Sequence, residues 1–519
     1  MRHAIRTMIT RRTLAQTLIA APFVLRAQTG PLRARVKIDT ERVIGDIDPK
    51  IYGNFAEHLG RCIDGGIFEE GSPLSDASGF RRDVLKAAKD LNVTQLRWPG
   101  GNFSSNYHWR DGIGPRDQRP PRLEMAWGTV ETNRFGTHEF LDYCGQLGAE
   151  PYICANLGTG TWTEAQEWVE YCNSAEDTAV TRERRKNGRA QPWKVTYWGL
   201  GNEMDGGWQM GHRDVVEYSK FALEAAKLMK WTDPNIKLIA AGSSNYGAGS
   251  DWIGWNRTVL DHLKNHADYL ALHMYVQNRE NDYADFVASS VQLQQYIKVA
   301  EGVINAALNG VRNRKIYIAW DEWNVWYRAR DNQKGRRILE EHYNLEDALV
   351  IATFLNTFVN NAHILKLANM AQLVNVIAPI FTSEQGLYLQ TIYYPLQMFA
   401  KNSRGQALEL FVDSPRYNSR RFNGVPYLDV SAAYDNGSLV LNVVNRHRTD
   451  SIETEFEAQD KSFVGTVEAI EVNGPDIKSE NDFNQNRVTP ATRTATAQQK
   501  RLRYSFPPHS YTMLRTKLV

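Results

Sequence analysis

The middle of the chain alternates short apolar runs with longer amphipathic stretches. Apolar runs of this length, rich in β-branched and aromatic residues, are typical of buried strands, whereas an apolar residue at every third or fourth position is typical of helices. The expected strands are 51–57, 93–98, 151–156, 195–200, 237–241, 269–274, 316–320 and 368–377. The expected helices between them include 80–91, 213–231, 289–308 and 345–364.

Eight strands separated by helices predict an α/β fold, a (β/α)8 TIM barrel over residues 51–395. Parallel strands need helical crossovers, and a barrel closes eight of them around one core. An open doubly wound sheet is the structural alternative. No GxGxxG or GxxxxGK motif follows the first strand, so nothing in the sequence supports a nucleotide-binding version of that sheet.

The pattern changes near residue 396. Short alternating strands separated by turn residues predict a C-terminal all-β sandwich, jelly-roll-like, over residues 396–519. Its expected strands are 407–412, 427–433, 438–445, 452–456, 465–472 and 502–505. Residues 33–38 also alternate, so we expect the segment 29–50 to add a strand to this domain from the other end of the chain.

The first 28 residues differ from the rest. Four arginines (Arg2, Arg6, Arg11 and Arg12) precede an apolar run at 14–25, which is too short to span a membrane. This order predicts a signal peptide over 1–28, and the paired arginines resemble a twin-arginine export signal. We therefore expect a periplasmic or extracellular protein that is free of the membrane after processing; an uncleaved membrane anchor is the alternative.

Composition removes several other classes of function. The net charge is only +2, so no basic surface indicates a nucleic-acid partner. The basic segment 182–189 is expected to be a solvated loop before the fourth strand. The four cysteines have neither a disulfide framework nor metal-ligand spacing, so we expect no metal and no other cofactor. Fourteen tryptophans and 23 tyrosines are compatible with sugar binding, because flat rings can cover the apolar faces of sugars.

Candidate chemistry gathers where the expected barrel strands end. Functional side chains of a (β/α)8 barrel lie at the carboxyl ends of its strands. Glu203 ends the fourth strand and Glu322 the seventh, so the two carboxyl groups should face each other across the mouth of the barrel. One carboxyl that protonates a leaving oxygen and one that attacks the anomeric carbon are what glycosidic bond cleavage needs. A single glutamate in such a place would more often cap a helix or bind an arginine.

Four motifs in this order resemble the α-L-arabinofuranosidases of glycoside hydrolase family 51. They are the segments 57–62 (EHLGRC), 97–103 (RWPGGNF), 197–206 (YWGLGNEMDG) and 320–324 (WDEWN). The resemblance implies the barrel and the sandwich, retention of configuration, and exo-acting release of arabinofuranose from arabinan, arabinoxylan or their oligosaccharides. It implies no cofactor, and it is consistent with a homo-oligomer.

The resemblance also assigns residues. Glu203 matches the general acid/base and Glu322 the nucleophile. The matching substrate-site positions are Glu57, Trp98, Asn102, Asn202, His273, Tyr275, Trp326 and Gln372. Among these, Tyr275 is expected to hydrogen-bond the nucleophile and Trp326 to form an aromatic wall. Some family members carry Cys where this chain has Asn102.

Two other interpretations stay open from the residues alone. Another retaining barrel glycosidase, such as an endo-β-glucanase or a β-xylosidase, would carry the same pair of carboxylates. A non-catalytic carbohydrate-binding protein would keep the barrel without turnover. A panel of chromogenic glycosides distinguishes all three.

Overall fold

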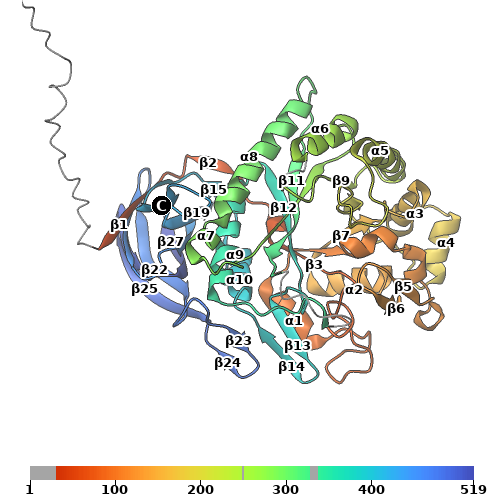
Figure 1. Ribbon diagram of the computed structural model, residues 1–519, viewed down its shortest axis with the longest axis horizontal. Helices are drawn as coiled ribbons and strands as arrows, with labels where there is room; N and C mark the ends of the chain where they lie inside the picture. The colour runs from red at the N-terminus through yellow and green to blue at the C-terminus, as the bar shows by residue number, and fades with distance from the viewer. Residues whose placement is uncertain (1–30, 248–250, 328–336) are drawn as a thin grey trace, which may run out of the picture.

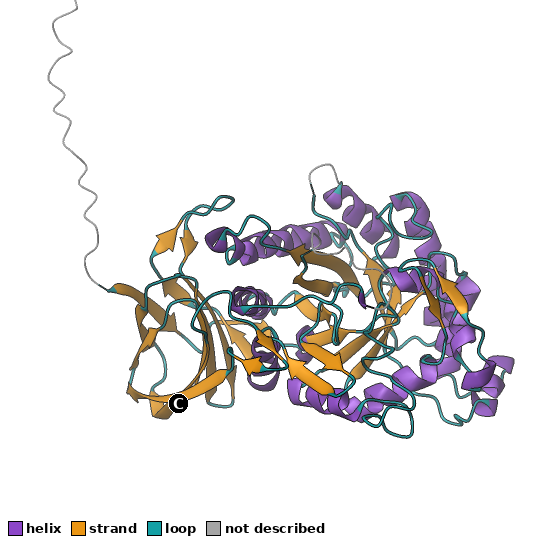
Figure 2. Cartoon of the chain, turned by 60° about the horizontal axis from the view of Figure 1, so that its bottom comes forward, coloured by secondary structure: helices purple, strands orange, loops and turns teal. Residues whose placement is uncertain are grey.

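The structure is a computed structural model, and it describes residues 31–247, 251–327 and 337–519. The expected signal peptide at 1–28 lies outside the described residues. The chain forms a barrel surrounded by helices and, beside it, a β-rich domain (Figures 1 and 2). Among the described residues, no helix is long and apolar enough to cross a membrane.

Eight parallel strands close into the predicted barrel. Their order around the ring is β10-β11-β12-β3-β4-β7-β8-β9. The strands are β3 (Gly53–Phe55), β4 (Gln95–Trp98), β7 (Glu150–Ala155), β8 (Tyr197–Leu200), β9 (Lys237–Ala241), β10 (Tyr269–Val276), β11 (Tyr317–Val325) and β12 (Leu365–Ala371). Almost all of their residues are buried, as expected for strands covered by helices on one face and by the barrel core on the other.

Helices cover the outside of the barrel. They are α1 (Arg82–Leu91), α2 (Thr137–Leu147), α3 (Trp162–Asn173), α4 (Ala179–Lys186), α5 (Val215–Thr232), α6 (Trp252–Leu263), α7 (Tyr283–Phe286), α8 (Ser289–Ala307), α9 (Leu345–Val359) and α10 (Tyr393–Asn402). Several begin where the sequence supplies a capping side chain; Asp214, for example, accepts hydrogen bonds from the backbone of Val216 and Glu217 at the start of α5.

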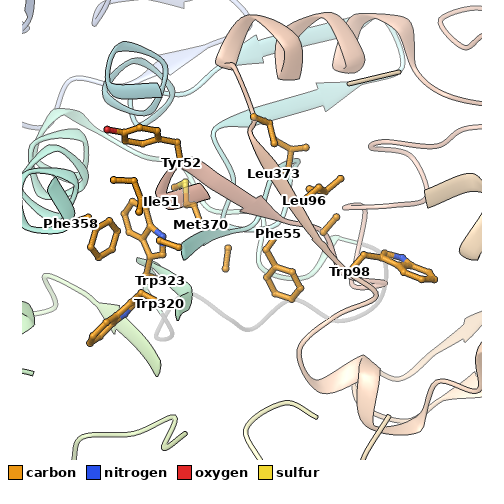
Figure 3. Close-up of a cluster of buried hydrophobic side chains, with 14 of the residues drawn as sticks. Ile51, Tyr52, Phe55, Leu96, Trp98, Trp320, Trp323, Phe358, Met370 and Leu373 are labelled. Atoms are coloured by element: carbon orange, nitrogen blue, oxygen red, sulfur yellow. The ribbon is translucent and has the colours of Figure 1, made fainter. Parts of the chain in front are cut away.

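Large apolar side chains fill the space between strands and helices. Trp320 and Trp323 of β11, Phe358 of α9 and Met370 of β12 belong to one buried cluster (Figure 3). Trp323 packs edge-on against Phe358, with ring centroids 5.0 Å apart. This packing fixes the strand ends that carry the site.

The second domain is one hydrogen-bonded series of eleven strands, in the order β16-β1-β21-β26-β25-β22-β27-β20-β19-β15-β2. The strands are β1 (Leu32–Ile38), β2 (Val43–Asp46), β15 (Gln406–Leu408), β16 (Phe411–Asp413), β19 (Leu428–Asp435), β20 (Ser438–Asn445), β21 (Ile452–Ala458), β22 (Phe463–Val472), β25 (Pro490–Gln498), β26 (Arg501–Phe506) and β27 (Ser510–Leu518). Val36 of β1 and Leu441 of β20 share one buried cluster, so the series folds back around its own core.

Strand β1 enters this domain from the N-terminal end of the described chain. It pairs in parallel with β21 along its whole length, from Leu32 opposite Ile452 to Ile38 opposite Ala458, and antiparallel with β16. The two ends of the described chain therefore build one domain.

Four two-stranded hairpins complete the part of the chain that the structure describes. They are β5 (Arg122–Glu124) with β6 (Thr129–Glu131), β13 (Ile380–Ser383) with β14 (Gly386–Leu389), β17 (Arg416–Tyr417) with β18 (Val425–Pro426), and β23 (Asn481–Asp482) with β24 (Gln485–Asn486).

Several predicted elements differ from the structure. The first barrel strand is shorter than predicted, because Pro49–Tyr52 form a 3-10 helix capped by Asp48. The eighth lies at Leu365–Ala371, earlier than predicted, and the segment predicted as a basic loop is largely α4. There Arg184 is buried and donates hydrogen bonds to the backbone carbonyls of Tyr171 and Ser174, so it is not solvated.

Candidate active site

The carboxyl groups of Glu203 and Glu322 lie together at the mouth of the barrel. Glu203 follows β8 and Glu322 lies in β11. One carboxylate oxygen of each, together with a ring nitrogen of His273, lie within 4.8 Å of one another. The sequence predicts that the two glutamates face each other across the mouth of the barrel. In the structure they are close enough for both carboxyl groups to contact the same bond of a substrate placed between them.

Glu322 is held from two sides. Arg97 Nη1 donates to Glu322 Oε1 at 2.8 Å, and the Tyr275 hydroxyl donates to Oε2 at 2.9 Å. The Tyr275 contact is the one expected from the sequence. Glu322 is buried, and both of its carboxylate oxygens are therefore fixed in direction, which is what an attacking group requires.

Glu203 is more accessible and lies on strained backbone. Its Oε1 is 2.9 Å from His273 Nδ1, and its Oε2 accepts a 2.6 Å hydrogen bond from the indole of Trp208, a 56% exposed side chain. Its φ of +44° is in the left-handed region, which costs a residue with a Cβ about 1–3 kcal/mol and is found mainly at functional sites. Displacing Trp208 would free one oxygen of Glu203 for a ligand.

A buried imidazole joins the two glutamates to Asp321. His273 Nε2 lies 3.3 Å from Asp321 Oδ1, while Nδ1 lies 2.9 Å from Glu203 and 3.6 Å from Glu322. Burial alone would lower the pKa of His273, but the three surrounding carboxylates raise it well above its ordinary value. The surrounding carboxylates thus favour the protonated form of the ring, and the ring lies within ion-pair distance of all three.

Glu57 provides a further carboxyl group in the same cavity. Its Oε1 accepts hydrogen bonds from the Phe103 backbone and the Trp127 indole, and its Oε2 from Gln372 Nε2 at 3.0 Å. Burial raises the pKa of Glu57 to about 7, and the nearby charge of Glu322 adds to this effect. An ionised carboxylate at this buried position lowers the stability of the fold, which is typical of side chains that bind a ligand.

Asn202, Glu57 and Glu322 converge on one point beside Gly101. A Cβ on Gly101 would lie 2.9 Å from Glu322 Oε1 and 3.5 Å from both Asn202 Nδ2 and Glu57 Oε2. Arg97 Nη2 donates to Asn202 Oδ1 at 2.6 Å, while Asn202 Nδ2 is buried with no hydrogen-bond partner among the described residues. Glycine here leaves open a space that offers one free donor and several acceptors, a set suited to hydroxyl groups.

The remaining predicted residues line the same cavity, whose volume is about 730 Å³. Asn102 is half-buried at the start of a 3-10 helix that follows β4. Trp326 is half-buried, and its ring lies edge-on to Tyr275 at a centroid distance of 5.1 Å. Gln372 directly follows β12 and also accepts a hydrogen bond from the Glu57 backbone.

Comparison with known proteins identifies the family of this chain. A model described as the α-L-arabinofuranosidase 1 domain matches residues 87–296, and one described as the α-L-arabinofuranosidase C-terminal domain matches residues 321–510. The intracellular exo-α-(1→5)-L-arabinofuranosidase 1 of Bacillus subtilis is 40% identical over 497 residues, covering 93% of this chain and 99% of that protein. The chain belongs to the α-L-arabinofuranosidases of glycoside hydrolase family 51.

Solved structures of family 51 arabinofuranosidases agree. The arabinose complex of the Thermotoga maritima α-L-arabinofuranosidase matches with a TM-score of 0.86 at 38% identity, over 93% of this chain and all of that one. A family 51 α-L-arabinofuranosidase from Bifidobacterium longum matches with a TM-score of 0.89 at 32% identity, over 94% of this chain and all of that one. The barrel and the β-rich domain are thus the architecture of the family.

One predicted site residue of this family 51 chain lies elsewhere. Trp98 is fully buried, does not line the cavity and belongs to the apolar core (Figure 3). Its ring stacks on Phe140 of α2 at 4.9 Å, and its indole nitrogen donates to His58 Nε2. Successive side chains of a strand point to opposite faces, so Arg97 enters the barrel and Trp98 faces the helices. The expectation that Trp98 binds substrate is therefore wrong.

Four residues at this arabinofuranosidase site were not predicted. Arg97 and Asp321 are both 1% exposed, and Arg97 Nε lies 3.5 Å from Asp321 Oδ2. Trp127 and Trp208 reach the site from loops. Arg97 and Asp321 lie inside the motifs that carry the family resemblance, so those motifs could have indicated them as site residues. The two tryptophans lie in loops, where no sequence pattern indicates a role in the site.

The family 51 site also has the geometry of a metal-binding cluster. Glu203, His273 and Glu322 each offer a ligand atom within 4.8 Å of the others. Carboxylate oxygen and imidazole nitrogen are ordinary ligands of Zn²⁺. The expectation that the enzyme needs no metal stays a prediction.

Proposed function

We propose that the chain is a retaining, exo-acting enzyme that releases terminal α-L-arabinofuranosyl residues from arabinan, arabinoxylan and their oligosaccharides. The observation that carries this proposal is the approach of Glu203 and Glu322 to within 4.8 Å. Retaining glycosidases place their carboxyl groups about 5 Å apart, whereas inverting enzymes leave room for a water molecule between them. The relatives support the choice of sugar and of exo action, since one of them is an exo-α-(1→5)-L-arabinofuranosidase and another was solved in complex with arabinose.

The reaction proceeds in two displacements. In the first, Glu322 attacks the anomeric carbon while Glu203 gives its proton to the glycosidic oxygen; that C–O bond breaks, and the remaining saccharide leaves as an alcohol. In the second, Glu203 takes a proton from water, the water oxygen bonds to the anomeric carbon, and Glu322 leaves as a carboxylate. Two inversions at one carbon retain its configuration.

The other residues orient these partners. Arg97 and Tyr275 fix the two oxygens of Glu322, and His273 fixes Oε1 of Glu203, which leaves Oε2 to face the leaving oxygen once Trp208 is displaced. We expect the sugar hydroxyls to bind Asn202 Nδ2 beside Gly101, together with the Glu57 carboxylate, Asn102 and Gln372, which line the cavity.

Variants of the two glutamates test both roles at once. Glu322→Ala should lose turnover of every substrate by several orders of magnitude, because no nucleophile remains. Glu203→Ala should still react with an activated aryl arabinofuranoside and accumulate the glycosyl-enzyme, because an activated phenolate hardly needs protonation. Glu384→Ala, an exposed glutamate on the β13–β14 turn, is the matched control and should keep full activity.

Azide separates the two assignments. In Glu203→Ala, azide attacks the trapped intermediate and gives a glycosyl azide of retained configuration; in Glu322→Ala it replaces the carboxylate and gives the inverted product. NMR of the two products reads the anomeric configuration. Exchanged outcomes would reverse the assignment, and hydrolysis of an aryl β-xyloside or β-glucoside in place of the arabinofuranoside would refute the proposed sugar.

We also propose that the protein is exported. The arginines of the leader followed by the apolar run at 14–25 support this, although a relative is named as intracellular. N-terminal sequencing of the protein from its native host should give a mature chain that starts near Gln28. Recovery of the full-length chain from the cytoplasm alone would contradict export.

A further inference from the structure

The cavity continues well beyond the catalytic glutamates. Its volume of about 730 Å³ is in the range of sites that enclose drug-sized ligands, roughly 300–1,000 Å³, and exceeds what one five-carbon sugar occupies. Glu203, His273 and Glu322 are part of its lining. Other lining residues lie along the loop after β10: Gln277, Asn278, Arg279, Glu280 and Asp282.

The far wall of this cavity is built by both domains. Asp285 and Phe286 of α7 line it, as does Arg421, which lies between β17 and β18. Arg421 Nε donates to Asp285 Oδ2 at 2.6 Å and the Arg421 backbone donates to Oδ1 at 2.8 Å. Asp285 is 3% exposed, so this ion pair anchors the β17–β18 segment on the barrel, where α7 lies beside the β-rich domain (Figure 1).

An exposed aromatic ring stands in the same wall. Tyr246, in the segment after β9, lines the cavity and is 39% exposed. Its ring stacks on that of the buried Tyr296 of α8, with centroids 3.6 Å apart, and the Tyr296 hydroxyl lies 3.4 Å from the Tyr246 backbone oxygen. One face of Tyr246 is therefore packed against protein, which fixes the ring.

Polar groups lie beside the Tyr246–Tyr296 pair. Gln292, which binds both the Tyr296 hydroxyl and Arg421 Nη1, lines the cavity together with Arg420. A fixed aromatic ring flanked by amide and guanidinium donors has the composition of a sugar-binding subsite, because the ring covers the apolar face of a sugar and the donors bind its hydroxyls.

We propose that this wall, made of Tyr246, Gln292 and Arg421, is a distal acceptor subsite for a neutral pentose unit of the polysaccharide, beyond the sugar that directly follows the cleaved bond. The inference rests on the proposed function and adds to it: the enzyme also binds the saccharide chain that carries the terminal arabinose. It also gives the β-rich domain a part in binding, since Arg421 comes from that side.

Chain-length kinetics test the subsite. The substrates are α-1,5-linked arabino-oligosaccharides of two to five units and an aryl α-L-arabinofuranoside, which has no sugar unit beyond the cleaved bond. For the wild type, kcat/KM should rise with length beyond the disaccharide. Tyr246→Ala should remove that rise, a loss of roughly tenfold for an aromatic contact of ordinary strength, and leave the aryl substrate unchanged. Tyr246→Phe should keep the rise.

The controls separate this inference from the proposed function. Trp231→Ala removes a 74% exposed ring of α5 that does not line the cavity, and it should change nothing. Equal kcat/KM for all lengths in the wild type, or an equal loss on aryl and long substrates in Tyr246→Ala, would overturn the subsite alone. Wild-type inactivity towards the aryl arabinofuranoside would overturn the proposed function, and this inference with it.

Discussion

Replacing Glu57 by glutamine should make the protein more stable at alkaline pH. The raised pKa of Glu57 means that the folded chain still holds a proton on this group between pH 4.5 and about 7, where the unfolded chain has lost it. Stability falls with rising pH wherever the folded state binds more protons. Glu57 therefore lowers the free energy of unfolding progressively across that window, and glutamine, which does not titrate, removes the effect.

The magnitude follows from the size of the shift. A rise from 4.5 to about 7 is about 2.5 pKa units at 1.36 kcal/mol each, so the full cost above pH 7 is about 3 kcal/mol. Between pH 5 and pH 8 the stability of Glu57→Gln relative to wild type should therefore grow by about 2–3 kcal/mol. Any constant cost, such as the contact between two amides at Gln372, cancels in this difference.

Urea unfolding at several pH values measures the effect. Glu384→Gln, at an exposed position, is the control and should follow the wild type at every pH. Glu57→Gln should also lose activity, because a hydroxyl-binding carboxylate is gone; stability gained while function is lost is the usual signature of a site residue. If the stability curves of Glu57→Gln and wild type stayed parallel from pH 5 to pH 8, the reasoning about this buried carboxyl would be refuted.

Three further predictions concern the support of the site, the second domain and metals. Asp321→Asn leaves His273 with a neutral partner, so we expect kcat to fall by about 100-fold with little change in KM. An unchanged kcat would show that Asp321 does not orient the imidazole. Ile38→Ala, at a fully buried position of β1, should lower the free energy of unfolding by about 2–5 kcal/mol in thermal or urea unfolding. Arg33→Ala on the same strand, with a 77% exposed side chain, should lower it by almost nothing. Equal losses in the two variants would contradict the inward register of β1. Dialysis against EDTA should leave activity intact, while excess Zn²⁺ should inhibit competitively through Glu203 and His273, and loss of activity in EDTA would refute the expected independence from metals.

The barrel could be predicted because its signal is local and repeated. Each buried strand is a short apolar run and each helix has an apolar stripe, and β9 was predicted to the residue. The β-rich domain was harder. Strand β25 was missed because its side chains are mostly exposed and small or polar, and β27 because it is central and largely buried, with threonines among its apolar residues.

The site residues that lie at strand ends or inside the motifs could be predicted from the sequence. Glu203, Glu322, Tyr275 and Gln372 all lie where a barrel places functional groups. Trp208 and Trp127 could not be found in this way, because loop conformation depends on tertiary contacts. Trp98 shows the opposite error: it shares a motif with Arg97, yet a one-residue step along a strand changes which face a side chain joins.

Asp321 was missed for a more specific reason. On a regular strand, Asp321 and Glu322 would point to opposite faces, so only one of them could reach the barrel interior. The pairing of β11 is irregular, however: Ala319 and Glu322 stand opposite Ala271 and His273 of β10, and Trp320 and Trp323 stand opposite Ala368 and Met370 of β12. Between these pairs β11 carries one extra residue against each neighbour, which is a β-bulge; against β12 the register has already shifted by one residue in the opposite sense between Ile318 and Ala319.

The bulge explains how one arginine can bind two consecutive acids. Arg97 lies 2.8 Å from Glu322 and 3.5 Å from Asp321, which is possible only because the extra residue turns both carboxylates towards the interior. Asp321 then reaches His273, and His273 reaches Glu203. A buried pair such as Arg97 and Asp321 contributes little net stability, but an unpaired charge there would cost about 3–5 kcal/mol, so the network persists as a unit. The distortion of one strand therefore couples the orientation of the nucleophile to that of the acid, and an alternating pattern of residue types contains no information about it.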